Sequence, residues 1–312
     1  MPITTSGRLD TPAARGARCL YSGTAEHPIY ADIVAAATGV ARRHPVVMVH
    51  GGCHTGACYI ATPDGREGWA GQFARLGHDA YALDWPGHGR SPACADLARL
   101  STREIAQSIR VLLEAIGPAI LLVHSASGPM AWWIAEAAPE LVVAVIGIAP
   151  GAPANILPVL PDDAAAVALL RDDESLGCPV MMPEDRPVVI GEAFMQTYWT
   201  NAPRFPAGAF RQYVHGVVPE SARLFNERFN IGGHGLAIRD PANLTMPKLI
   251  VTGDLDLRHP REVDEATARY VGAEFMWLPD RGIRGNGHMT MIEDNSDEIA
   301  LLLLDWLHAR GL

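Results

Sequence analysis

The sequence predicts an α/β protein in which a mostly parallel central sheet carries helices on both faces and is interrupted by one inserted segment. Short apolar runs over residues 45–49, 119–123, 142–148 and 248–251 lack the two-residue alternation of a strand that faces water on one side. Such runs are typical of parallel strands that are buried on both faces. Helical stretches separate them, and this alternation of strands and helices indicates a doubly wound sheet. The stretch 151–245 breaks the rhythm.

Signals for helices fall between the predicted strands. Ser101 and Glu104 form a capping box in the sequence, the run that follows is amphipathic, and Gly117 is placed to end it. Further helices are expected over residues 67–76, from about residue 129, over residues 261–270 and over residues 294–309.

The stretch 151–245 is rich in proline and aromatic residues and holds no run typical of a buried strand. It lies between the sixth and seventh predicted strands. We therefore expect residues 1–150 and 246–312 to form one core, with residues 151–245 as a lid inserted into it.

The composition excludes several classes of protein. The 312 residues are 48% hydrophobic and 19% charged, which is typical of a soluble globular protein. A net charge of -10 offers no basic face, so nucleic-acid binding is not expected. The N-terminus lacks a secretory signal and no apolar run could span a bilayer, so we expect a cytoplasmic protein without membrane association. The oligomeric state stays open, a homodimer included.

The five cysteines are an odd number without framework spacing. Reduced thiols are the expectation, and a disulfide between Cys53 and Cys58 is not expected.

A candidate nucleophile follows the apolar run 120–123. Ser125 stands between this run and small residues that precede a helix start at Pro129. A serine in this position occupies a strained strand-to-helix turn that exposes its hydroxyl. Val123, two residues earlier, stands where glycine is usual. Ser127 is the rival nucleophile, but it would lie one step into the helix.

A serine hydroxyl needs a neighbouring imidazole to take its proton, and that imidazole needs a carboxylate. His288 lies in a glycine-rich loop between the last apparent strand, 274–278, and the C-terminal helix. Asp254 and Asp256 both follow the run 249–252. We favour Asp256 as the acid and expect Asp254 to bond backbone amides.

Attack on a carbonyl creates an oxyanion, which backbone amides commonly stabilise. The amide of Ala126 is one natural donor. The second is expected from the glycine-rich stretch 50–56, where Gly52 is the first choice and Cys53 the adjacent one.

Together these residues resemble the α/β-hydrolase superfamily. The resemblance rests on His50 to Gly52, Asp84 to Ser91, the Ser125 turn, Gly253 to Asp256, and His288. It implies the α/β-hydrolase fold, the order serine, acid, histidine along the chain, and a structural role for Asp84.

A closer resemblance is to a bacterial esterase subfamily. It rests on Thr62 to Trp69, His124 to Gly128, and Asn286 to Met289. Members of that subfamily can carry the acid as a glutamate after the sixth strand, where this chain has Ala149. The resemblance then leaves Asp256, at the more usual site, as the acid.

We therefore predict a serine hydrolase that cleaves a carboxylic ester or lactone with an uncharged or apolar part through an acyl-enzyme, with no cofactor and no metal. An apolar pocket over the serine is expected from His124, Met181, Phe194, Tyr198 and Trp199. For most of the lid's aromatic residues, however, we favour a place in a small core of the lid itself.

Other functions remain open. A carbon-carbon bond hydrolase, a thioesterase or an amidase would use the same residues, and a non-catalytic protein could retain the pocket to bind a small molecule. A metal hydrolase is disfavoured because His50, His54 and His88 lack the spacing of a zinc site.

Overall fold

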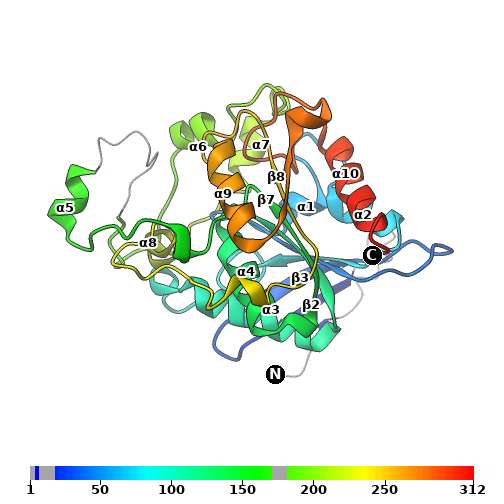
Figure 1. Ribbon diagram of the computed structural model, residues 1–312, viewed down its shortest axis with the longest axis horizontal. Helices are drawn as coiled ribbons and strands as arrows, with labels where there is room; N and C mark the ends of the chain where they lie inside the picture. Colours follow the sequence, from blue (N-terminus) through cyan, green and yellow to red (C-terminus); the bar gives the residue numbers. More distant parts are fainter. Residues whose placement is uncertain (1–3, 7–17, 171–180) are drawn as a thin grey trace.

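The computed structural model describes residues 4–6, 18–170 and 181–312 (Figure 1). Its centre is a sheet in which the described residues contribute strands in the order β1-β2-β3-β5-β4-β6-β7-β8-β9. The strands are β1 Thr4–Ser6, β2 Arg18–Gly23, β3 Pro28–Val34, β4 Val46–Val49, β5 Ala80–Asp84, β6 Ala119–His124, β7 Val142–Ile148, β8 Lys248–Thr252 and β9 Glu274–Trp277.

From β5 to β9 all neighbouring strands are parallel, whereas β1, β2 and β3 pair antiparallel and β3 joins β5 antiparallel. The prediction of a mostly parallel sheet is confirmed. The strands β2 and β3 were not predicted, because their residues mix polar and apolar types, as expected of antiparallel strands near a sheet edge.

Helices cover both faces of the sheet. One buried cluster joins the sheet to α3, α4 and α9, and a second joins it to α2 and α10. The Ser101 capping box opens α3 as predicted. These helices are α2 Trp69–Arg75, α3 Thr102–Ile116, α4 Gly128–Ala137, α9 Arg261–Val271 and α10 Ser296–His308.

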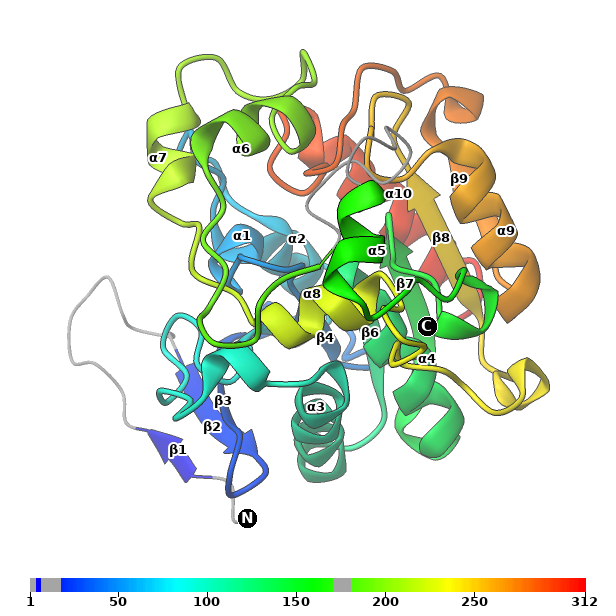
Figure 2. The same ribbon diagram turned by 90° about the vertical axis from the view of Figure 1, so that its left-hand side faces the viewer.

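The inserted segment lies between β7 and β8, and its described residues contain short helices and turns but no strand of the sheet. Figures 1 and 2 show α6 and α7 together at the upper side of the molecule and α5 at its periphery, opposite α10. The helices are α5 Ala164–Leu169, α6 Glu192–Tyr198, α7 Phe210–Val214 and α8 Ala222–Arg228, and a further short helix of the core is α1 Ala57–Ile60.

The expectation that most aromatic residues of this segment form a small core of its own is wrong, because they pack with the core of the sheet domain. Met195, Trp199, Tyr213 and Phe225 belong to the same buried cluster as α2 and α10. The segment is therefore packed onto the sheet domain beside the loops that follow the parallel strands.

None of the helices in the described ranges is both long enough and apolar enough to cross a bilayer.

Candidate active site

Ser125 lies in a strained turn between β6 and α4. Its φ of 52° falls in the left-handed region, which a residue with a side chain adopts only where the surrounding structure enforces it. The Gly151 amide donates to the Ser125 carbonyl at 2.7 Å. A β-carbon on Gly128 would stand 2.4 Å from the Gly151 carbonyl oxygen, so the turn is packed tightly against the loop after β7.

Val123, which stands where glycine is usual, is accommodated in the core. Its side chain is buried in the cluster of α3 and α4. The rival Ser127 is also buried, and its hydroxyl donates to the His124 carbonyl at 2.8 Å while accepting from the His124 amide at 2.9 Å. Ser127 therefore closes the turn.

The structure brings Ser125, His288 and Asp256 into one hydrogen-bonded chain. The Ser125 hydroxyl lies 3.0 Å from His288 Nε2, and His288 Nδ1 lies 2.8 Å from Asp256 Oδ2. Because a carboxylate can only accept, Nδ1 carries the proton and Nε2 is free to take one from the serine. The other oxygen of Asp256 accepts the amides of Arg258 and His259 at 2.8 and 3.1 Å.

The environment prepares these groups for proton transfer. Burial raises the pKa of Asp256, but the His288 imidazole and the hydrogen bonds outweigh it and hold that pKa at about 2. Burial lowers the pKa of His288, and Asp256 offsets this only in part. At neutral pH the pair is therefore a carboxylate beside a neutral imidazole, which is the state of a general base.

Asp254 holds the loop of the histidine. Its Oδ1 accepts the amides of Gly285 and Asn286 at 2.8 and 3.2 Å. The buried Glu293 accepts the Gly287 amide at 2.7 Å. Asp254 therefore bonds amides as expected, although they belong to the His288 loop and not to its own turn.

His124 supports the same loop. Its Nε2 lies 3.0 Å from the His288 carbonyl oxygen, to which it donates. Burial lowers the pKa of His124 well below its ordinary value, with a further contribution from the charge of His288, so the ring is neutral.

The glycine-rich loop after β4 lies opposite Ala126. A β-carbon built on Gly52 would stand 3.7 Å from the β-carbon of Ala126. Among the described residues, the amides of Gly52 and Ala126 have no hydrogen-bond partner. Both are therefore available to a ligand beside Ser125.

The amide of Cys53, the adjacent choice for the oxyanion hole, is already engaged. It donates to Glu220 Oε2 at 2.9 Å. The expectation for Cys53 is therefore corrected, because an amide bound to a buried carboxylate cannot also bind an oxyanion. The thiol of Cys53 is buried, which together with the charge of Glu220 raises its pKa well above the ordinary value.

A small cavity of about 20 Å³ lies over the serine, roughly enough for one water molecule. An acyl group therefore needs some of its walls to move. The lining residues are Gly52, His54, His124, Ser125, Ala126, Phe194, Trp199, Phe225, Arg228, Arg258 and His288.

Of the predicted pocket residues, His124, Phe194 and Trp199 line this cavity. Tyr198 does not; its ring packs on Phe194 with centroids 4.7 Å apart. The prediction for Met181 is also wrong, because Met181 does not line this cavity.

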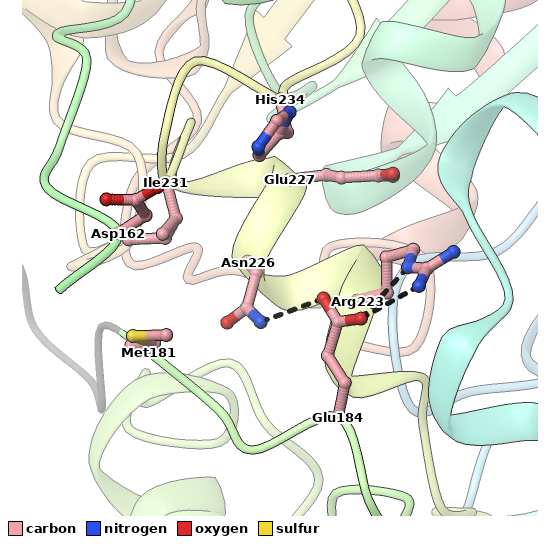
Figure 3. A pocket seen from close by; sticks show the side chains of 8 residues that line it. All are labelled: Asp162, Met181, Glu184, Arg223, Asn226, Glu227, Ile231 and His234. Atoms are coloured by element: carbon pink, nitrogen blue, oxygen red, sulfur yellow. Dashed lines mark hydrogen bonds and ion pairs between the residues drawn. The ribbon is translucent and has the colours of Figure 1, made fainter. Parts of the chain in front are cut away.

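Met181 lines a different pocket, of about 440 Å³, on the outer side of α8 (Figure 3). There it packs against the small cluster of Val167 and Ile231. Figure 3 also shows Glu184 bound to Arg223 and Asn226 in this pocket. No serine, threonine or cysteine stands among its lining residues, which are Asp162, Met181, Glu184, Arg223, Asn226, Glu227, Ile231 and His234.

Sequence reasoning missed five residues at or beside the cavity: His54, Phe225, Arg228, Arg258 and Glu220. Only His54 and Arg258 could have been found from the sequence, because they lie in or beside the predicted oxyanion loop and the predicted acid. The other three lie in the inserted segment, where no spacing singled them out.

The histidines considered for a metal bind other partners. His50 and His88 hold backbone carbonyl oxygens of Gly51 and Pro86, and His54 holds that of Gly52. Within the residues that the structure describes, no group of three or more metal-binding side chains is arranged to hold an ion.

Comparisons with known proteins agree with this architecture. The model of the alpha/beta hydrolase family matches residues 46–300. The probable secreted lipase phiG of a fungus (Fungal sp., strain ATCC 74256) is 25% identical over 331 residues, covering 85% of this chain and 81% of the fungal one.

Two solved structures show the same fold. An esterase from Thermogutta terrifontis matches with a TM-score of 0.63 at 17% identity, over 99% of each chain. The esterase RhEst1 from Rhodococcus sp. ECU1013 matches with a TM-score of 0.64 at 17% identity, over 94% of this chain and 98% of that one. At such identities the likeness concerns the fold alone.

Proposed function

This chain belongs to the alpha/beta hydrolase family, and we propose that it is a serine hydrolase that cleaves a carboxylic ester or lactone through an acyl-enzyme. Ser125 is the nucleophile, His288 the general base and Asp256 the acid that orients the imidazole. The proposal is carried by one observation, the hydrogen-bonded chain of 3.0 Å from Ser125 to His288 and 2.8 Å from His288 to Asp256.

The first half of the reaction forms the acyl-enzyme. His288 Nε2 takes the proton of the Ser125 hydroxyl as its oxygen attacks the substrate carbonyl, and Asp256 stabilises the imidazolium. The amides of Gly52 and Ala126 bind the oxyanion. When the intermediate collapses, His288 gives its proton to the departing alkoxide and the acyl group stays on Ser125.

The second half releases the acid. His288 takes a proton from water, whose oxygen attacks the acyl carbonyl, and then returns that proton to Ser125. The stretch 151–245 acts as a cap that excludes bulk water from these steps. This role is supported by Trp199 and Phe225, which come from the segment and line the cavity.

The substrate is an uncharged ester or lactone. The aromatic wall of Phe194, Trp199 and Phe225 favours an apolar group next to the carbonyl. The name of the fungal relative, a probable lipase, supports an ester as the substrate.

We also propose that the protein works in the cytoplasm. Cys53, Cys58 and Cys94 are free thiols, which suits a reducing compartment. The fungal relative is named as a secreted protein, so cell fractionation of the source organism is the test. Cys178 lies outside the described residues.

A fluorophosphonate probe tests the function directly. We expect it to label the wild-type protein at Ser125 and to leave Ser125→Ala unlabelled, while Ser127→Ala is still labelled at Ser125. A panel of p-nitrophenyl esters, lactones, thioesters and anilides then ranks the substrates. A folded wild-type sample that neither reacts with the probe nor turns over any member of the panel is a binding protein and not an enzyme.

A further inference from the structure

A carboxylate from the inserted segment is buried directly behind the glycine-rich loop. Glu220 has no exposed surface. Its Oε2 accepts the Cys53 amide at 2.9 Å, and its Oε1 accepts the Ser221 amide at 2.7 Å and lies 3.2 Å from His88 Nε2. None of these contacts belongs to the hydrogen-bonded chain of Ser125, His288 and Asp256.

Cys53 is held in an unfavourable backbone conformation at this point. Its φ is 63°, in the left-handed region, although it carries a side chain. Its carbonyl accepts the Val218 amide at 2.9 Å, so both its amide and its carbonyl are bonded to residues of the inserted segment. Without these partners the strained conformation would have little to retain it.

The carbonyl of Gly52, the other end of the same peptide unit, is fixed as well. His54 Nδ1 donates to it at 2.7 Å, and the Tyr213 hydroxyl donates to His54 Nε2 at 2.9 Å. Burial lowers the pKa of His54 to about 4, so the ring is neutral and this direction of the two bonds is fixed.

The peptide before Gly52 has its own anchor. The Trp85 amide donates to His50 Nε2 at 3.1 Å, so the proton of His50 is on Nδ1, which donates to the Gly51 carbonyl at 2.7 Å. Gly52, whose backbone would otherwise be the freest of any residue type, therefore lies between two fixed peptide units. The direction of its amide is set by both.

The imidazole of His88 faces the carboxylate of Glu220. A lone carboxylate behind the loop would repel a developing oxyanion. His88 Nδ1 donates to the Pro86 carbonyl at 3.0 Å, and Nε2 faces Glu220. Burial lowers the pKa of His88, but the charge and hydrogen bond of Glu220 outweigh it and raise that pKa above its ordinary value. The Glu220 carboxylate therefore favours the charged form of the His88 ring that faces it.

We infer that Glu220 is a positioning residue for the oxyanion hole: by holding the Cys53 amide it aims the amide of Gly52 at the reacting carbonyl, so the hole is complete only when the inserted segment is docked. The inference rests on the proposed function. Glu220 touches no substrate atom and acts through the loop.

The test compares Glu220→Gln with Glu227→Gln. Glu227 comes from the same segment and binds the Thr102 amide at 2.7 Å, away from the loop. Each variant is titrated with a fluorophosphonate so that kcat is given per reactive serine, and the inhibition constant of a trifluoromethyl ketone, which forms an oxyanion on the enzyme, is measured beside KM.

We expect Glu220→Gln to lose about tenfold to a hundredfold in kcat per site and a similar factor in affinity for the ketone, with KM nearly unchanged. Glu227→Gln keeps the wild-type values. A purely structural role of Glu220 instead lowers the number of titratable sites and leaves kcat per site unchanged, and that result overturns the inference.

Tyr213→Phe covers the case in which Glu220→Gln does not fold. It removes only the hydroxyl that fixes His54, and we expect the same pattern at smaller size, a loss in kcat and ketone affinity with KM kept. If Tyr213→Phe kept the wild-type kcat and ketone affinity, the inference that these contacts fix the glycine-rich loop would be contradicted. Activity in Ser125→Ala, by contrast, would remove the proposed function itself.

Discussion

The imidazole ring of His259 is stacked on that of His288, with ring centroids 5.4 Å apart and planes 18° from parallel. The same residue donates its backbone amide to Asp256, and its Nδ1 lies 2.9 Å from Asp264. One residue therefore contacts both the base and the acid of the candidate site. Its charge is one of the causes that lower the pKa of His288, after burial.

His259→Gln is predicted to raise the pKa of His288. Removing the neighbouring imidazole removes a repulsion that disfavours the charged form of His288. Because the base must be neutral, activity is lost as the pH falls through its pKa, and the acid limb of kcat/KM should move to higher pH in the variant. A midpoint that is unchanged or lower would contradict this. The control is His308→Gln, at the C-terminal end of α10.

Asp256→Asn is predicted to lower kcat by about 10⁴-fold, since the amide no longer fixes the tautomer of His288. Asp254→Asn should act mainly on the free energy of unfolding, because its carboxylate bonds the amides of Gly285 and Asn286. Steady-state kinetics and urea denaturation of both variants separate the two roles. If Asp254→Asn proved the more damaging change in kcat, the assignment of the acid would be reversed.

His88→Gln is predicted to cost up to about 3–5 kcal/mol of unfolding free energy at pH 6, because it leaves the buried Glu220 without its counter-charge. The raised pKa of His88 means that its contribution is complete below the unfolded value and is lost as the pH rises through the folded one. The difference between wild type and variant should therefore shrink from pH 6 to pH 9. Urea titrations at both values measure it, and a difference that grows with pH would reverse the sign.

Cationic esters are predicted to be poor substrates, because Arg228 and Arg258 line the cavity over Ser125. Acetylcholine and 3,3-dimethylbutyl acetate have the same shape and differ by one positive charge. We expect kcat/KM for the neutral ester to be at least about tenfold higher than for acetylcholine. In Arg258→Gln this ratio of the two kcat/KM values should be smaller. Arg269→Gln, on the outer face of α9, serves as the matched control and should leave it unchanged.

The three residues of the proposed triad could be predicted because each follows a strand of a parallel sheet, and the carboxyl ends of such strands meet at one edge. The structure brings Ser125, His288 and Asp256 together at that edge. The chain order and the loop positions carried this prediction, with no need for the fold of the inserted segment.

The sequence predicted where the inserted segment begins and ends, but not where its individual side chains lie. Met181 was predicted at the serine because its side chain is apolar and flexible. In the structure it packs against Val167 and Ile231 and lines another pocket. Glu220 has no motif around it, and only its burial against Cys53 and His88 shows what it does. Contacts between segments far apart in sequence are not encoded in local spacing.

The burial of Cys53 provides a way to measure how often the inserted segment opens. Its thiol is buried, and its raised pKa keeps it protonated and unreactive toward alkylating agents. In a variant that keeps Cys53 as its sole cysteine, we expect iodoacetamide to react only when the bonds of Cys53 to Glu220 and Val218 open and the inserted segment lifts away. The plateau rate of that alkylation at high reagent concentration would equal the frequency of lifting, in native protein and without any attached label.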